Sequence, residues 1–435
     1  MKIAIVGYGL QGESSYHYWN KDGNQITVCD VNDSIVAPSG VETQLGEAYL
    51  KNLERFDLIV RTPFLHPRDI VAANGPAILD KVTTNTNEFF RVCPSKNIIG
   101  VTGTKGKGTT TTLITRMLEK VGQTVHLGGN IGTPPLVLLN EAIQPSDWVV
   151  LELANFQLID LKYSPKIGVC LMVVPEHLDW HKEMAEYITA KQQLFTHQQT
   201  DNIAIYYADN EYSQQVVSVS QGRHIPYLKP PGAIVKDDAI MIDNQTICST
   251  GDLKLIGKHN WQNICAAVTV LWQIDPNLEL IHSVVTSFEG LEHRLEKVTE
   301  LDGVTYYNDS FAATPEAAIA AIESFTAPKV MIVGGFDRGL PLAHMAKTML
   351  RHNDDLRKVI VMGASGLRLT DEFDKIGFKN YLINSSKDIA EIVNQARSFA
   401  KPGDVVVLSP GFASFDMFKN FEVRGQQYKA AVRNL

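Results

Sequence analysis

The chain has few cysteines and no long apolar run. Its five cysteines are scattered over 435 residues and form no Cys-x-x-Cys pair. This argues against a zinc site or a disulfide framework and favours buried free thiols in a reducing compartment. No apolar run approaches the roughly 18 residues that a membrane span needs, and a strand-like segment follows Met1 directly, which leaves no room for a signal peptide. We therefore expect a cytoplasmic protein with no membrane partner.

Basic residues are not in excess, and repeats are absent. Lys and Arg number 40 against 48 Asp and Glu, a formal net charge of −8, which argues against a chain-wide nucleic-acid footprint. There is no internal repeat, low-complexity tract or long charge run. The length predicts two to four globular domains, and we expect no nucleic-acid partner.

Short apolar runs alternate with helical stretches along the whole chain, which predicts α/β domains with mostly parallel sheets. The predicted strands are residues 3–6, 26–29, 58–60, 149–153, 167–174, 203–207, 330–333, 359–362 and 405–408. New strand–loop–helix units begin after residues 93–96 and after residues 290–294. The sequence therefore predicts three domains, residues 1–94, 95–291 and 292–435.

Residues 100–115 are the most informative stretch. An apolar run is followed by Gly103, Gly106 and Gly108 and by a Thr-rich helix start. Backbone N–H groups in such a loop surround a phosphate, and Lys107 supplies a mobile cation for it. The usual Ser or Thr after this Lys is here Gly108, so Thr109 is the nearest hydroxyl for Mg²⁺. The alternative is a glycine-rich turn without a ligand. We predict an ATP site formed by Gly103, Thr104, Lys105, Gly106, Lys107, Gly108, Thr109 and Thr110.

A second phosphate-binding pattern lies at the start of the chain. Gly7-Tyr-Gly9-Leu-Gln-Gly12 follows a strand, and Asp30 ends the next strand. This matches a dinucleotide-binding fingerprint, and by itself it could serve NAD, a nucleotide-sugar diphosphate or nothing. A dehydrogenase would leave the loop near residue 103 without a role. Two such loops favour one nucleotide-linked substrate plus ATP.

Polar side chains follow two strands of the middle region. Glu152 ends an apolar run, which is a natural place for a Mg²⁺ ligand beside a phosphate loop. His177 and His181 follow another strand end, where their spacing resembles a zinc pair, but no third ligand of matching spacing is evident. Lys191 lies in a predicted helix over residues 185–195 and taken alone reads as a solvated lysine.

The last third of the chain carries further polar strand ends. Asn263 lies in a predicted helix that starts near Gly257, and Arg294 lies at a predicted domain junction, where it could reach a phosphate or form a salt bridge. The clusters at residues 308–310, 335–338 and 409–416 could together bind a small anionic substrate.

Taken together, these motifs resemble the Mur ligases, and among them the members that add D-glutamate. The resemblance runs through the whole chain. It is carried by the Gly-Thr-Lys-Gly-Lys loop, Gly128-Gly-Asn-Ile-Gly-Thr-Pro134, Glu152-Leu-x-x-Phe-Gln157, His177-Leu-Asp179, Lys191, His259-Asn260-x-x-Asn263, His293-Arg294-Leu-Glu296, Asn308-Asp-Ser310 and the long motif from Ser409 to Gly425. It implies an α/β fold with a Rossmann-like N-terminal domain, a central P-loop ATPase-like domain and a Rossmann-like C-terminal domain.

The resemblance also implies a reaction. ATP phosphorylates the carboxylate of UDP-N-acetylmuramoyl-L-alanine, and the amine of D-glutamate displaces phosphate from the acyl phosphate. Lys107, His177, Lys191 and Arg294 would be catalytic. Two Mg²⁺ sites are implied, with Thr109, Glu152, His177 and a carbamylated Lys191 as ligands. Arg294, Asn263 and Asp309 would contact ATP. Gly9, Leu10, Gln11, Asp30 and Asn130 would bind the UDP substrate, and Arg338, Ser414 and Phe421 the amino acid.

Three departures from the family pattern bear on specificity. Gly108 follows the loop lysine, as in folylpolyglutamate synthetases. Phe311 and Ala313 replace a Lys and a Thr near the amino acid site, and Arg338 replaces a Lys. A related amide ligase, either folylpolyglutamate synthetase-like or a glutamate ligase of altered stereospecificity, is therefore the alternative, and a non-catalytic nucleotide-binding protein is the third. We expect a monomer.

Overall fold

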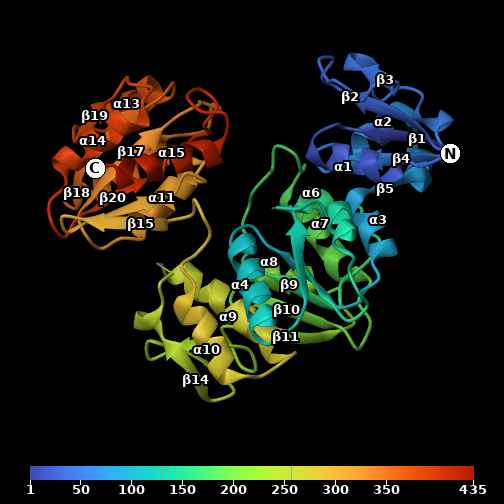
Figure 1. The fold of residues 1–435 in the computed structure, drawn as a ribbon, viewed down its shortest axis with the longest axis horizontal. Coiled ribbons are helices and arrows are strands. Elements are labelled where there is room, and N and C mark those ends of the chain that lie inside the picture. Colours follow the sequence, from blue (N-terminus) through green and yellow to red (C-terminus); the bar gives the residue numbers. More distant parts are fainter. Residues whose placement is uncertain (131, 256) are drawn as a thin grey trace. The chain divides into compact units, whose positions relative to one another are not determined.

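The computed structural model describes residues 1–130, 132–255 and 257–435 (Figure 1). The chain divides into two compact units. The first comprises Met1–Leu253 and His259–Ser287, and the second comprises Lys254–Lys258 and Phe288–Leu435.

The first unit begins with a parallel five-stranded sheet of order β3-β2-β1-β4-β5. Residues 3–6 are wholly buried in β1, as expected of a parallel strand that helices cover on both faces. The strands are β1 (Lys2–Val6), β2 (Gln25–Asp30), β3 (Glu42–Leu45), β4 (Leu58–Arg61) and β5 (Val82–Thr84), and the helices are α1 (Leu10–Trp19), α2 (Pro67–Asn74) and α3 (Asn85–Val92).

A parallel six-stranded sheet of order β11-β10-β9-β6-β8-β7 follows in the same unit. Its strands are β6 (Ile98–Thr102), β7 (Val125–Gly129), β8 (Trp148–Glu152), β9 (Ile167–Cys170), β10 (Ile203–Tyr207) and β11 (Arg223–Tyr227). The helices are α4 (Lys107–Lys120), α5 (Pro135–Leu138), α6 (Asn155–Leu158), α7 (Met184–Thr196), α8 (Glu211–Val217), α9 (Lys258–Trp272) and α10 (Leu278–Ser287). A small antiparallel sheet is formed by β12 (Ile234–Lys236), β13 (Ala239–Ile242) and β14 (Gln245–Ser249).

One apolar core joins the two parallel sheets of the first unit. It includes Val60 of β4 and Phe89 of α3 together with residues of β8 and α7. Arg61, at the end of β4, is completely buried, and its guanidinium donates to both carboxylate oxygens of Asp160, at 2.9 and 2.6 Å. Since a buried charge is tolerated only when it is paired and hydrogen-bonded, this contact fixes the end of β4 against the segment that follows α6.

The second unit is built on a six-stranded sheet of order β15-β16-β20-β17-β18-β19. β15 is antiparallel to β16, and the other pairs are parallel. Successive residues of β17 face opposite sides of the sheet, Met331 packing with α11, α12 and α13 and Val330 with α14 and α15. The strands are β15 (Glu296–Leu301), β16 (Val304–Asn308), β17 (Lys329–Gly334), β18 (Leu356–Met362), β19 (Tyr381–Ile383) and β20 (Val405–Leu408), and the helices are α11 (Pro315–Glu323), α12 (Ala343–Arg351), α13 (Gly366–Lys375), α14 (Ile389–Phe399) and α15 (Phe421–Arg433).

The predicted α/β class with parallel sheets is confirmed. Seven of the nine predicted strands coincide with an observed strand to within one residue at each end. The strand expected over 359–362 begins earlier, at Leu356, and the strand expected over 167–174 ends at Cys170. The antiparallel elements β12–β15 were not predicted. All five cysteines are buried and free, as expected. Among the described residues, no helix is both long and apolar enough to cross a bilayer. The three domain borders stay a prediction.

Candidate active site

The predicted phosphate loop connects β6 to α4. Gly103 and Gly106 have φ angles of +145° and +88°, which side chains other than glycine rarely adopt. A Cβ atom at Gly106 would lie 2.1 Å from Oδ1 of Asn263 in α9. The loop therefore needs glycine at this position, and α9 packs directly against it.

Lys107 is the first residue of α4, and its amino group lies over the loop. Nζ donates to the carbonyl oxygens of Gly103, at 3.1 Å, and Thr104, at 3.0 Å. The hydroxyl of Thr110 is buried and has no hydrogen-bond partner among the described residues, and Thr109 is buried beside it. Cation, hydroxyls and helix start thus meet at one place, as phosphate binding requires.

Glu152 ends β8, the neighbour of β6 in the sheet. Its side chain is buried, and Oε1 accepts a hydrogen bond of 3.0 Å from Nδ2 of Asn130. Oε2 is also buried but has no partner within the described part of the chain. Because an unpaired buried carboxylate oxygen is costly, this atom is suited to bind a cation, so Glu152 fits a Mg²⁺ site.

His177 follows the strand end at Cys170 and is strained. Its φ angle is +58°, and its ring lies 4.8 Å from that of Phe156. Burial lowers the pKa of His177, and the positive charges of Lys107 and Lys191 act in the same direction against the carboxylate of Glu176. A neutral ring keeps a lone pair for a metal ion.

Lys191 is completely buried in α7, so its reading as a solvated helix lysine is wrong. Nζ donates to the carbonyl oxygen of Gly103, at 3.1 Å, and to Oγ1 of Thr102, at 3.4 Å, and it lies 4.5 Å from the ring centre of Tyr187. Within the described ranges, no carboxylate is paired with it. Burial lowers the pKa of Lys191 to about 7, and the charge of Lys107 adds to this effect. The sequence did carry a signal for this burial, because the helix neighbours of Lys191 three and four residues away are the apolar Tyr187, Ile188, Leu194 and Phe195, all of them buried.

The structure does not pair His177 with His181. His181 instead faces Glu186 together with His66, with Nδ1 3.6 Å from Oε2 and the Nε2 of His66 3.2 Å from Oε1. Nδ1 of His66 accepts the backbone N–H of Arg68, which places the proton of a neutral ring on Nε2, and Nε2 is buried with no hydrogen-bond partner among the described residues. The ligand atoms of these three residues lie within 4.8 Å of one another, close enough to hold a metal ion. No sequence signal marked His66 or Glu186.

The N-terminal nucleotide loop has the expected geometry. Gly7 has φ of +93°, and a Cβ on Gly12 would lie 2.0 Å from the carbonyl oxygen of Gly7. The carboxylate of Asp30 accepts the backbone N–H of Tyr8 at 2.6 Å and thus ties the loop to β2. The helix α1 starts at Leu10 and Gln11, directly after Gly9, whose Cα faces open space.

In the second unit, Asp309 is buried at the end of β16. Its carboxylate accepts hydrogen bonds from the hydroxyl of Ser409, at 2.7 Å, and the backbone N–H of Leu295, at 3.1 Å. Burial raises the pKa of Asp309 to about 7, although these bonds oppose the change. The guanidinium of Arg294 lies 3.8 Å from the ring centre of Phe311, so the residue that replaces the family lysine stacks on this arginine.

The predicted amino acid site lies at three strand ends of the same sheet. Ser414 is buried after β20, and Phe421 is the first residue of α15, with its ring 5.0 Å from that of Phe311. Arg338 is exposed on the loop after β17. The neighbouring Asp337 is held by the guanidinium of Arg368 at 2.6 and 2.5 Å, which fixes the base of that loop.

Two family descriptions match the chain. The Mur ligase middle domain matches residues 101–271, and the Mur ligase glutamate ligase domain matches residues 293–412. UDP-N-acetylmuramoylalanine–D-glutamate ligases from Clostridium kluyveri and Clostridium acetobutylicum are 36% and 37% identical to the chain, over 100% of its length and 97% and 96% of theirs. The chain belongs to the Mur ligase family.

Solved structures of this family share the fold. The UDP-N-acetylmuramate–alanine ligase MurC of Thermotoga maritima has a TM-score of 0.62 at 16% identity and covers 100% of this chain and 99% of its own. A MurF ligase from the same organism, in complex with ADP, has a TM-score of 0.62 at 18% identity. The match covers 100% of this chain and 95% of the MurF chain. The predicted family and fold are confirmed.

In this Mur ligase, the structure brings most predicted first-unit residues to the phosphate loop. Lys107 and Lys191 donate to the same carbonyl oxygen of Gly103, Asn263 packs on Gly106, and Asn130 holds Glu152. The roles of these residues stay predictions.

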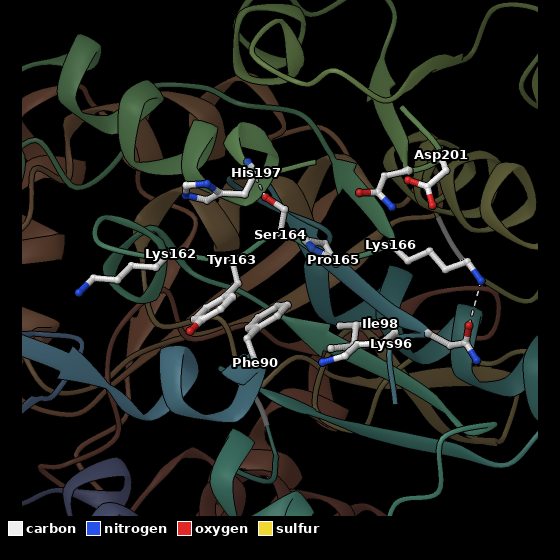
Figure 2. Close-up of a pocket in the computed structure, with 12 residues that line it drawn as sticks. Phe90, Lys96, Ile98, Lys162, Tyr163, Ser164, Pro165, Lys166, His197 and Asp201 are labelled. Atoms are coloured by element: carbon white, nitrogen blue, oxygen red, sulfur yellow. Dashed lines mark hydrogen bonds between the residues drawn. The ribbon is translucent and has the colours of Figure 1, made fainter. Parts of the chain in front are cut away.

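A separate cavity of about 470 Å³ lies at the start of β6 and β9, the edge of the sheet opposite to the loop. Lys96, Lys162 and Lys166 are among its lining residues. Figure 2 shows the amino groups of Lys162 and Lys166 pointing to opposite sides, so they do not converge on one anion. This cavity is not part of the candidate site.

Proposed function

We propose that this Mur ligase uses ATP to join D-glutamate to UDP-N-acetylmuramoyl-L-alanine in the synthesis of peptidoglycan precursors. The proposal is supported by the relatives of that name, which match over the whole chain. The observation that carries it is the phosphate loop, where Lys107 and the buried Lys191 meet on one carbonyl oxygen.

A carboxylate is a poor electrophile, and the reaction overcomes this in two steps. An oxygen of the substrate carboxylate forms a bond to the γ-phosphorus of ATP, and the bond to ADP breaks. The amine of glutamate then attacks the carbonyl carbon, phosphate leaves, and the nitrogen loses a proton to give the amide. The first step builds negative charge on the phosphoryl oxygens, which Lys107 and Arg294 would stabilise.

Mg²⁺ neutralises phosphate charge during such a transfer. We assign Thr109, Glu152 and His177 as residues that would hold it. The buried and unpaired Oε2 of Glu152 supports this assignment. A second ion would be held by a carbamate on Lys191.

The carbamate is supported by the surroundings of Lys191. The nitrogen of an uncharged amine forms a bond to the carbon of CO₂ and releases one proton to solvent, and complete burial disfavours the charged form of this lysine. The resulting carbamate offers hard oxygen ligands to Mg²⁺, which an amine cannot.

We predict that Lys191→Ala is inactive and is partly restored by short-chain carboxylic acids, whose oxygens replace the missing carbamate. Phosphate release with and without acetate measures this. Lys120→Ala, at the end of α4, is the matched control and should keep wild-type turnover without acetate. Full activity of Lys191→Ala in CO₂-depleted buffer would show that the carbamate is not needed.

The remaining assignments concern substrates. We assign Gly9, Leu10, Gln11, Asp30 and Asn130 to the UDP substrate. Asn263 would contact adenine and Asp309 the ribose of ATP, with the phosphates on Gly103–Thr110. Arg338, Ser414 and the backbone of Phe421 would bind glutamate.

We also propose three domains, residues 1–94, 95–291 and 292–435, in a cytoplasmic monomer. Sedimentation equilibrium of the full chain tests the oligomeric state, because a stable dimer would give twice the molecular mass of the monomer.

The decisive experiment measures phosphate release from ATP with UDP-N-acetylmuramoyl-L-alanine and either D- or L-glutamate. We expect release only with D-glutamate. Release with L-glutamate would indicate altered stereospecificity, and release only with a folate substrate would indicate the alternative ligase class.

A further inference from the structure

The turn that carries His177 is held in a strained conformation. The carbonyl oxygen of His177 accepts the backbone N–H groups of Trp180, at 3.1 Å, and His181, at 2.9 Å. Its positive φ angle is unfavourable for a residue with a side chain. Such a conformation persists only where neighbouring groups enforce it.

The neighbouring groups come from the N-terminal sheet. Nε1 of Trp180 donates to the carbonyl oxygen of Phe64, at 2.8 Å, and the guanidinium of Arg68 donates to the carbonyl oxygen of Trp180. The ring of His66 lies 4.2 Å from that of Trp180. Arg68 also pairs with Glu186 of α7, at 3.3 Å. The loop after β4 and the first turn of α2 therefore bind both the turn and the helix that carries Lys191.

Aromatic contacts extend this hold to His177 itself. The ring of Phe156 lies 5.0 Å from that of Phe64 and 4.8 Å from those of both His177 and Trp180. The carbonyl oxygen of Phe156 accepts a hydrogen bond of 3.2 Å from the buried Arg61. The imidazole of His177 thus packs on a ring that the end of β4 fixes in place.

The same loop begins beside the N-terminal nucleotide loop. The backbone N–H of Thr62 donates to the carbonyl oxygen of Val6, at 3.0 Å, and a Cβ on Gly7 would lie 2.0 Å from Oγ1 of Thr62. The residues that hold the His177 turn are therefore attached to the rigid end of the first sheet, which makes them suited to set the position of a ligand residue.

We propose that Arg68 and Trp180 are positioning residues for Mg²⁺ binding, which hold His177 in its left-handed conformation through contacts from the N-terminal sheet. This inference rests on the proposed role of His177. The loss of Arg68 or Trp180 frees the turn to relax, and the ion then loses a preset ligand.

The test uses the full chain with a non-hydrolysable ATP analogue and Mn²⁺ as the probe, detected by electron paramagnetic resonance. Arg68→Gln removes both contacts of the guanidinium, and Trp180→Phe removes the bond to Phe64 while it keeps a ring. We expect each to weaken Mn²⁺ binding by about tenfold, as for other groups that orient metal ligands. Arg68→Lys should recover part of the loss. Arg55→Gln, at an exposed arginine in the short turn before β4, is the matched control and should bind like wild type.

Turnover supplies the second readout. In both variants the Mg²⁺ concentration for half-maximal phosphate release should rise by a similar factor, while the rate at saturating Mg²⁺ stays near that of wild type. Unchanged Mn²⁺ binding in both variants, or a rate that saturating Mg²⁺ does not restore, would overturn the proposal. His177→Ala separates the two levels of inference. If it leaves Mn²⁺ binding unchanged, the proposed metal role of His177 fails. If it weakens binding while Arg68→Gln and Trp180→Phe do not, only the positioning role fails.

Discussion

Lys107 is the residue whose chemistry is most directly tied to its position. Its amino group rests on the carbonyl oxygens of Gly103 and Thr104, at the start of α4, where helix N–H groups also point. We predict that Lys107→Ala lowers turnover by about 10²–10³-fold or more, because a lost charge-stabilising donor has an effect of that order. Steady-state phosphate release measures the loss.

The matched control for this variant is Lys120→Ala. Lys120 is the last residue of the same helix and is exposed. Its loss should leave turnover near that of wild type, since it lies at the opposite end of α4 from the phosphate loop. Similar rates in the two variants would contradict the role of Lys107.

Arg338 is the residue on which amino acid specificity depends most. It replaces a family lysine, and its guanidinium can hold a carboxylate through two parallel hydrogen bonds. We predict that Arg338→Ala raises the KM for D-glutamate by about tenfold or more, the loss expected of one charged hydrogen-bonding group, and leaves the KM for ATP near its wild-type value. The KM for D-glutamate of Arg338→Lys should lie between that of wild type and that of Arg338→Ala. Initial rates at varied D-glutamate concentration measure this KM. An unchanged KM for D-glutamate in Arg338→Ala would show that Arg338 is an exposed loop residue without a role in binding glutamate.

At the scale of elements, polar pairs fix strand ends against the segments that follow them. His126 of β7 is one such residue, with its ring nitrogens 2.6 Å from Glu141 and 3.0 Å from Asp147. Burial alone would lower the pKa of His126, but the hydrogen bonds to both carboxylates outweigh it and the pKa is raised. The folded state therefore binds this proton more tightly than the unfolded chain does.

The sign of the pH dependence follows from this raised pKa. The stabilisation, about 1 kcal/mol for one charged hydrogen-bonded group, is complete below the unfolded pKa near 6.5 and is lost as the pH rises through the folded pKa. We predict that the difference in melting temperature between wild type and His126→Gln shrinks from about pH 6 to about pH 8. His224→Gln, an exposed histidine of β11, should show no such trend. A difference that grows with pH would contradict the assignment.

At the scale of the whole molecule, ligand binding should stabilise the fold. A ligand that binds only the folded state adds about 2.7 kcal/mol at 100 times its dissociation constant. We predict that an ATP analogue with Mg²⁺ raises the melting temperature by several degrees and that EDTA removes most of this increase. Calorimetry of the full chain measures both. The same increase in Lys107→Ala with EDTA would place the nucleotide elsewhere.

Much of this protein could be predicted from local sequence. The alternation of apolar runs with helical stretches is enough for parallel α/β sheets, because a strand buried on both faces must be apolar throughout. The phosphate loop could be located from the spacing of Gly103, Gly106 and Lys107 after an apolar run. The positive φ angle of Gly106 explains why glycine is needed there. These features depend only on neighbours within a few residues along the chain, so they can be predicted from the sequence.

Only the tertiary structure decided which distant groups meet. Lys191 reads as a surface lysine and is buried because α7 packs against the loop after β6. Phe311 replaces a lysine in the sequence and stacks on Arg294 in the fold. Arg68 carries no motif, yet it binds Trp180, more than 100 residues away. Burial, pairing and strain arise between segments that are remote in sequence, and they depend on how the sheets pack rather than on any local pattern.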